Sequence, residues 1–140
     1  MDEARPYTQA VARLRSAGLR PTRQRLALAR LLFESGDRHV SAEGLHGEAL
    51  AGGARVSLAT VYNALNQFTA VGLLREIVVD SGRSYFDTNT SLHHHFFHED
   101  TSRLEDIAGE RITVSGMPEA PAGTAVSRVD VIVRVRSKQD

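Results

Sequence analysis

The sequence predicts an α+β chain in which helices fill the first half and strands follow. Two changes of pattern support this fold class. Up to residue 71, apolar residues recur at intervals of three and four, as they do on the buried face of a helix. After Gly72 the spacing becomes that of extended strands, and a Ser-Gly turn at 81–82 separates the first two. At 140 residues the chain fits one compact domain or two small ones.

Four helices are expected, each with a recognisable start or stop signal. Serine and threonine are favoured N-caps because their side-chain oxygen accepts a backbone N–H that the first turn leaves without a partner. Glycine just past a helix supplies the left-handed residue that commonly ends it. These signals place the helices at residues 7–17, from Thr22 to the break at Gly36, from Ser41 to Gly52, and at 58–71 behind the N-cap Ser57.

Short strands are expected after the helices. Residues 73–80 and 83–88 form a hairpin, and helices followed by such a hairpin predict a winged helix-turn-helix. Valine alternates with charged residues along 128–136, which predicts a strand with one buried face. Ile132 falls on its polar side and is a candidate subunit contact. Two more short strands are expected at 93–99 and 103–107, and residues 116–127 are expected to form a loop or one short helix.

Composition excludes several classes of protein. The chain has no cysteine, so disulfides and thiolate-bound zinc or haem are impossible within it. No apolar run approaches the ~20 residues that a membrane helix needs, and no signal peptide is recognisable, so we expect a cytoplasmic protein. The net charge is zero, but residues 1–30 hold seven arginines against two acids. This basic start indicates a polyanion partner.

Three consecutive histidines, His93 to His95, are the most informative feature of the chain. On a strand His93 and His95 share one face and His94 points the other way. Two imidazoles at this spacing form a metal-binding pair, to which Asp87 and Asp106 would add oxygen ligands. A solvated histidine run is the alternative. It is less favoured because the run is internal and flanked by aromatic residues.

The last helix before the hairpin is expected to enter the major groove of DNA. Its exposed face carries short polar groups that suit base edges, and asparagine and glutamine pair well with adenine. Ser57 and Thr60 near its N-terminus are candidates to hold a phosphate, helped by the helix dipole. Solvated helix faces are the alternative reading. The predicted DNA contacts are Arg15, Arg20, Arg23, Arg25, Ser57, Thr60, Tyr62, Asn63, Gln67 and, on the hairpin turn, Arg83, with Arg13 and Asn66 as further candidates.

Three segments resemble the ferric uptake regulator family of metal-dependent repressors. They are Ala17 to Arg25, Arg38 to Glu43 and Ser57 to Phe68. The run from Tyr85 to Ser91, followed by His93 to Phe97, is more narrowly similar to the iron response regulator branch, Irr, of alphaproteobacteria. The resemblance implies a winged-helix domain over residues 1–86 and a small α/β domain over 87–140 for dimerisation and metal or haem sensing.

The resemblance also implies a regulatory metal site at the junction of the two domains. Its ligands fall on His39, Asp87, His93, His95 and Asp106, and Mn, Fe and Zn all suit them. The structural zinc that most family members bind through cysteines cannot form here. Any haem would need histidine ligation, from His93, His94 or His95.

Together these features predict a homodimeric DNA-binding regulator, mainly a repressor, of iron and haem metabolism. Its expected partners are an A·T-rich palindromic operator and a second copy of the chain. A direct Mn- or Fe-dependent repressor and a peroxide sensor of the same family are the alternatives. A small metalloenzyme using the His-x-His strand is a third reading, disfavoured because no general base or substrate motif is evident. We therefore expect no enzyme.

Overall fold

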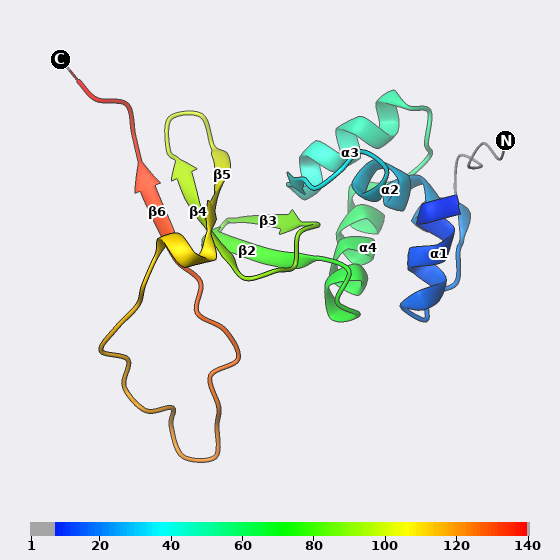
Figure 1. Ribbon diagram of the computed structural model, residues 1–140. Helices are drawn as coiled ribbons and strands as arrows, with labels where there is room; N and C mark the ends of the chain where they lie inside the picture. The colour runs from blue at the N-terminus through cyan, green and yellow to red at the C-terminus, as the bar shows by residue number, and fades with distance from the viewer. Residues whose placement is uncertain (1–7, 140) are drawn as a thin grey trace, which may run out of the picture. The chain divides into compact units, whose positions relative to one another are not determined.

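The computed structural model describes residues 8–139, which form two compact units (Figure 1). The first unit ends at Thr90 and the second begins at Ser91. The first unit contains α1 (Thr8–Ser16), α2 (Arg23–Phe33), β1 (His39–Val40), α3 (Ala42–Ala51), α4 (Leu58–Ala70), β2 (Arg75–Asp80) and β3 (Arg83–Asp87). The second contains β4 (His93–His98), β5 (Arg103–Ala108), the 3-10 turn η1 (Gly109–Arg111) and β6 (Ile132–Val135). The mixed α+β class predicted from the sequence is confirmed.

Three of the helices begin at the capping residues that the sequence indicates. The side chains of Thr22, Ser41 and Ser57 each accept the backbone N–H of the residue three positions on, over 3.3, 3.0 and 3.1 Å. Each cap satisfies one donor that the first helical turn leaves unpaired. The expected start of the first helix, residue 7, lies outside the described residues.

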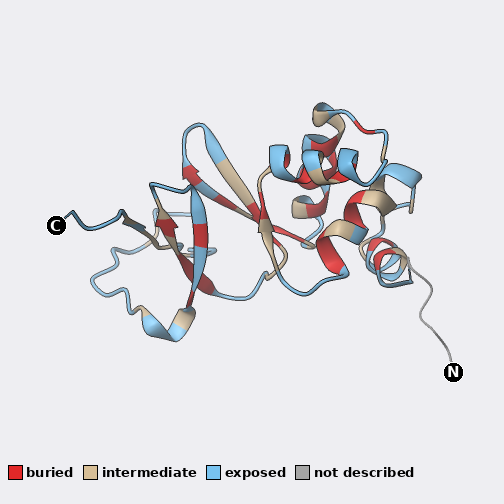
Figure 2. Ribbon diagram, turned by 90° about the horizontal axis from the view of Figure 1, so that it is seen from above, coloured by how far each residue is buried: buried red, intermediate tan, exposed pale blue. Residues whose placement is uncertain are grey.

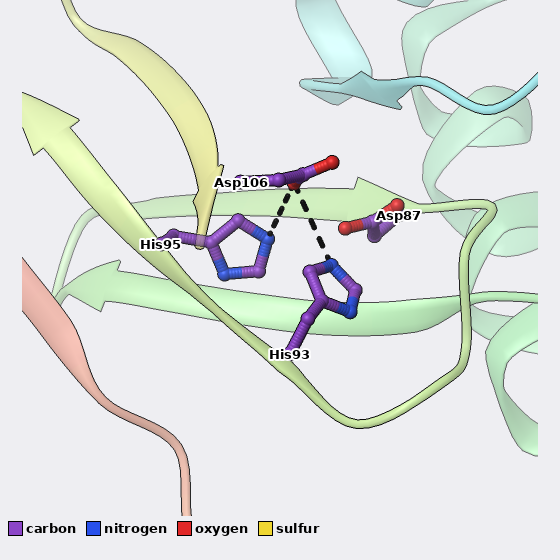
Figure 3. Close-up of side chains that lie close together, drawn as sticks. All are labelled: Asp87, His93, His95 and Asp106. Atoms are coloured by element: carbon purple, nitrogen blue, oxygen red, sulfur yellow. Dashed lines mark ion pairs between the residues drawn. The ribbon is translucent and has the colours of Figure 1, made fainter. Parts of the chain in front are cut away.

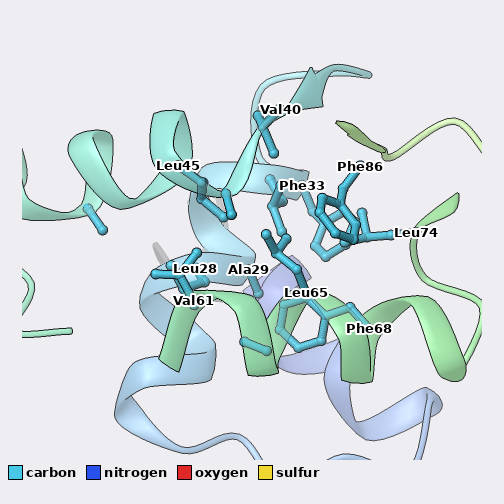
Figure 4. Packing of buried hydrophobic residues seen from close by; sticks show 14 of the residues in the cluster. Leu28, Ala29, Phe33, Val40, Leu45, Val61, Leu65, Phe68, Leu74 and Phe86 are labelled. Carbon is cyan, nitrogen blue, oxygen red and sulfur yellow. The ribbon is translucent and has the colours of Figure 1, made fainter. Parts of the chain in front are cut away.

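The core of the first unit lies between the helices and the adjoining sheet (Figure 4). Leu65 and Phe68 of α4 are completely buried, and the Phe68 ring lies 6.5 Å from that of Phe33 on α2. Packing these residues inward turns the opposite face of α4 to solvent. Figure 2 shows buried and exposed positions alternating along the helices of this unit. The exposed positions include Tyr62, Asn63, Asn66 and Gln67.

The sheet of the first unit has the strand order β1-β3-β2 and is antiparallel throughout. β1 was not predicted, because two residues are too few to show a periodic pattern. It matters because its register places His39 directly opposite Asp87, and β2 places Arg75 opposite the same aspartate on the other side. Directly opposed residues project from the same face of a sheet.

The sheet of the second unit has the order β5-β4-β6, with β6 parallel to β4. The prediction of a strand over 128–136 was too long, since only Ile132–Val135 is a strand. The register pairs His95 with Ile132, so residue 129 would face Leu92, before β4 begins. The strand begins at Ile132 because the N–H of Val131 bonds the side chain of His94 rather than the backbone of β4. Residues 116–127 contain no helix or strand. Across residues 8–139, none of the helices has the length and apolar character of a membrane span.

Candidate functional site

Two histidines and one aspartate converge on one side of the second sheet (Figure 3). His93 and His95 lie two residues apart on β4, and Asp106 is the register partner of His95 on β5. The Nε2 atoms of His93 and His95 lie 3.6 and 3.4 Å from the same oxygen, Oδ1 of Asp106. Both imidazoles are buried, whereas the Asp106 side chain is 53% exposed. The cluster is therefore rigid on its histidine side and open to solvent on its carboxylate side.

The orientation of the His93 ring is fixed by the main chain. Its Nδ1 lies 2.7 Å from the carbonyl oxygen of Ser91, which can only accept a hydrogen bond, so Nδ1 must be the donor. In the neutral ring Nε2 then carries no proton, and its lone pair faces Asp106 Oδ1. Two electron-rich atoms facing each other need a proton or a cation between them. A backbone carbonyl that holds the other ring nitrogen is also the usual support for a metal-binding histidine.

The spacing of these three donor atoms suits a single metal ion. Two ligands at about 2.1 Å from one ion in a tetrahedral arrangement lie about 3.4 Å apart. The donor atoms of His93, His95 and Asp106 lie within 4.8 Å of one another. Two imidazoles and a carboxylate form a donor set of intermediate softness that accepts Mn, Fe or Zn. The residues present therefore fit a divalent metal, although three ligands leave its coordination incomplete.

His94 takes a separate role in the second unit. It is buried, and its Nδ1 accepts the backbone N–H of Val131 over 3.1 Å. This bond ties β4 to the segment that leads into β6.

The first unit holds two more of the predicted ligands. His39 and Asp87 are register partners on β1 and β3, so their side chains project from the same face of that sheet. Asp87, which Figure 3 also labels, is buried and accepts the backbone N–H of Asn89 over 2.9 Å. Arg75, on its other side, is buried as well.

Five of the predicted DNA contacts line one hollow of the first unit. The hollow lies between the start of α2 and the exposed face of α4. It contains threonine hydroxyl groups and the amide groups of asparagine and glutamine beside two guanidinium groups. Its predicted members are Arg20, Arg25, Thr60, Asn63 and Gln67, and Thr22, Gln24 and Ala64 complete it. This mixture of cations with short polar side chains can contact phosphates and base edges together.

Hydrogen bonds within this surface restrict what each residue offers. Arg25 donates through Nη2 to Gln67 Oε1 over 3.0 Å, which takes up one of the two lone pairs of the amide oxygen used in bidentate pairing with adenine. Ser57 both caps α4 and donates its hydroxyl proton to Thr60 Oγ1 over 2.9 Å. A phosphate at this helix end would therefore meet the Thr60 hydroxyl rather than the Ser57 hydroxyl.

The remaining predicted DNA contacts lie elsewhere on the first unit. Tyr62 and Arg83 line a second hollow, between α4 and the β2–β3 turn. Arg83 is held by Asp80, whose Oδ2 lies 2.6 Å from its Nη2. Arg23 lines a third hollow, between α2 and α3, and Arg15 is exposed in the last turn of α1.

Three residues of these surfaces were missed by the sequence analysis. Ser91 orients His93 through its carbonyl, Arg75 is buried opposite Asp87, and Glu43 accepts a hydrogen bond from the Tyr62 hydroxyl. The Ser91 and Arg75 roles depend on backbone geometry and strand register, which leave no sequence motif. The alternation of β2 does carry a signal, since Arg75 stands in phase with the buried Ile77 and Val79.

Comparison with known proteins identifies the family to which this chain belongs. The profile of the Ferric uptake regulator family matches residues 16–131. The chain belongs to this family. Members of the Ferric uptake regulator family are transcription regulators rather than enzymes, as the sequence analysis expected. The matched range includes α4, the predicted reading helix, and the strands β1, β3, β4 and β5, which hold the predicted ligands.

Individual relatives agree with the family assignment. The ferric uptake regulation protein of Shigella flexneri is 42% identical over 82 residues, which are 59% of this chain but only 55% of that protein. The peroxide-responsive repressor PerR of Staphylococcus aureus is 34% identical over 99 residues, 71% of this chain and 66% of the relative. The structure of the ferric uptake regulator from Pseudomonas aeruginosa with manganese has a TM-score of 0.68 at 27% identity and covers 93% of this chain and 98% of that chain.

Proposed function

We propose that this chain is a homodimeric DNA-binding repressor whose affinity for its operator is set by a divalent metal ion. The observation that carries the proposal is the convergence of two histidine Nε2 atoms on Asp106 Oδ1, with one imidazole oriented by a backbone carbonyl. The names of its relatives, a ferric uptake regulation protein and a peroxide-responsive repressor, support the same activity. The polar, arginine-rich hollow beside α4 supports DNA as the partner.

The proposed metal site joins two partial sites, one on each unit. The first consists of His39 and Asp87, and the second of His93, His95 and Asp106. Only residues 88–92 connect Asp87 to His93, so the chain keeps the partial sites within reach of one another. When bound, the metal supplies coordinate bonds that hold ligands of both units together.

Coordination of this kind would restrict the angle between the units. In a dimer that angle sets the distance between the two α4 helices, and this distance must match the spacing of two operator half-sites. Metal occupancy and DNA affinity are then thermodynamically linked, so DNA should also raise metal affinity.

Two different signals, haem and peroxide, are compatible with the proposed function. The resemblance to the Irr branch supports release from DNA by haem, and the site would then report on iron and haem supply. Similarity to a peroxide-responsive repressor supports the other version, in which iron at the site sensitises its histidines to oxidation. An A·T-rich palindrome is the operator expected in each case.

The test is DNA affinity measured by fluorescence anisotropy. A duplex selected from a random library by manganese-loaded protein serves as the operator probe, and its scrambled sequence is the reference. Metal-stripped protein is titrated separately with Mn²⁺, Fe²⁺, Zn²⁺ and haem at fixed salt, since affinity for DNA depends strongly on ionic strength. We expect a divalent metal to tighten operator binding at least tenfold.

His95→Ala should abolish that response and leave the protein folded. His98→Ala is the matched control, because His98 lies on the same strand but pairs with Glu105, 2.9 Å away, outside the cluster. A metal response that survives in His95→Ala would contradict the proposed site. Selection of no preferred duplex would contradict the proposed function.

A further inference from the structure

Tyr62, the aromatic residue on the exposed face of α4, is held by a carboxylate of another helix. Its hydroxyl donates a hydrogen bond to Oε1 of Glu43, in the first turn of α3. The residues are nineteen positions apart in sequence, and both are exposed. The Tyr62 side chain is 40% exposed, so it lies along the surface with its ring accessible and its hydroxyl restrained.

Glu43 is not needed to cap α3. Ser41 already fills that role, accepting the N–H of Gly44 over 3.0 Å. A carboxylate in the first turn does gain from the helix dipole, but this gain does not depend on which way the side chain points. The direction of Glu43, across to α4, therefore needs a separate explanation.

The pair lies in a hollow beside the exposed face of α4. Tyr62 and Glu43 line a hollow together with Asn66 and with Arg83 of the β2–β3 turn. Arg83 forms an ion pair with Asp80, and Glu76 adds a second carboxylate to that of Glu43 in the lining of the hollow. This part of the surface is thus rich in acidic groups, unlike the hollow between α2 and α4, where arginines predominate among the charged groups.

We infer that Glu43 is a positioning residue for sequence readout: it holds Tyr62 in the orientation that contacts a base, and its charge weakens indiscriminate binding to phosphate. The inference rests on the proposed DNA-binding function and deepens it. An exposed tyrosine must lose rotational freedom about two side-chain bonds to make a specific contact, and a hydrogen bond formed beforehand removes part of that cost.

The negative charge has a second effect. A carboxylate near the DNA backbone repels phosphates of every sequence equally, whereas the oriented ring favours only matching bases. Because this repulsion acts on every sequence alike, it lowers the affinity for both probes, and the ratio between them is set by the oriented ring. The pair Glu43–Tyr62 would thus sacrifice some total affinity for discrimination.

The experiment compares the ratio of scrambled-probe Kd to operator Kd across a set of metal-loaded variants. Glu43→Ala and Tyr62→Phe each remove the hydrogen bond, and we expect each to lower the ratio about tenfold, the effect of losing one base contact. The double variant should show no further loss, because both changes remove the same interaction. Glu43→Gln keeps an acceptor without the charge. Its Kd ratio should therefore stay within about twofold of the wild-type ratio, while both probes bind more tightly.

Glu119→Ala, an exposed acidic residue of the other unit, controls for the change in net charge, and urea unfolding verifies that each variant is folded. A ratio unchanged in Glu43→Ala, or losses that multiply in the double variant, would overturn the inference. A ratio in Glu43→Gln that falls as far as it does in Glu43→Ala would overturn it as well. If the wild type itself prefers no sequence, the proposed function fails and the inference with it. If the wild type discriminates and Glu43→Ala does so equally, the inference alone fails.

Discussion

Single residues of this protein are placed by neighbours that their own sequence position does not reveal. The backbone carbonyl of Ser91 turns the His93 ring, and strand register puts Arg75 and His39 on either side of Asp87. Arg38 makes a bidentate pair with Glu48, with Nη2 2.5 Å from Oε2 and Nη1 2.8 Å from Oε1. Its main chain meanwhile bonds Thr88. These contacts fix the residue immediately before His39, and so support a predicted ligand without touching the metal.

Tyr62 gives a titration prediction at this scale. The hydrogen bond to the Glu43 carboxylate raises the pKa of Tyr62 above its usual value of about 10 and lowers the pKa of Glu43. The bond needs the protonated phenol. The stability that it contributes to the folded state is therefore complete below the ordinary tyrosine pKa, and it is lost as pH rises through the raised pKa of Tyr62.

The measurement is phenolate absorbance against pH, with Tyr62→Phe subtracted to isolate this tyrosine. In Glu43→Ala the pKa of Tyr62 should fall back toward 10. An unchanged titration in that variant would mean that the two side chains do not interact in solution.

Helices and strands differ in how far their ends follow from local sequence. Capping is local, which is why Thr22, Ser41 and Ser57 could be recognised as helix starts and are confirmed as N-caps. Strand ends depend on partners. β1 exists because β3 passes beside it. β6 is shorter than its valine alternation suggests, because the N–H of Val131 bonds the His94 side chain instead of the backbone of β4.

Ser57→Ala gives a stability prediction at the scale of the element. The variant removes the bond to the Thr60 N–H and the bond to the Thr60 hydroxyl. It should lower the free energy of unfolding by about 1 kcal/mol, as loss of an N-cap commonly does. Urea denaturation of the metal-free protein measures the change. Ser35→Ala, outside any helix, is the matched control and should have little effect. Equal stabilities for the two variants would show that the cap contributes nothing.

Part of the candidate metal site could be predicted from the sequence, because alternation along a strand is a local property whereas strand register is not. Alternation along a strand is enough to put His93 and His95 on one face, and the structure brings Asp106 to them through register. Nothing in the spacing of residues could give that register, because it depends on the turn between β4 and β5. The sequence pattern of β4 likewise does not reveal that His94 bonds Val131, a residue far along the chain.

At the scale of the whole molecule, a bridging metal would make the two units unfold together. A ligand that binds only the folded state adds about 2.7 kcal/mol at a hundred times its dissociation constant. We expect zinc, which is diamagnetic and leaves NMR signals sharp, to raise the melting temperature of both units. Tyrosine fluorescence reports on the first unit, since the chain has no tryptophan and all three tyrosines precede residue 91. The NMR signals of His93 to His95 and His98 report on the second. His39→Ala should remove the gain of the first unit, whereas His98→Ala should keep it. Stabilisation confined to the second unit would show that the ion does not bridge.

The strand β6 also has a consequence for the way the second sheet assembles. β4 and β5 are joined by a tight turn, but β6 returns to the sheet only after residues 112–131. Closing a short loop is faster than closing a long one, so the β4–β5 hairpin should form first and β6 should dock last. Until then one edge of β4, with its unpaired amide and carbonyl groups, remains open to a strand from another chain. Refolding should therefore become less efficient as protein concentration rises, and newly synthesised chains are most prone to aggregate in the interval before their last strand arrives.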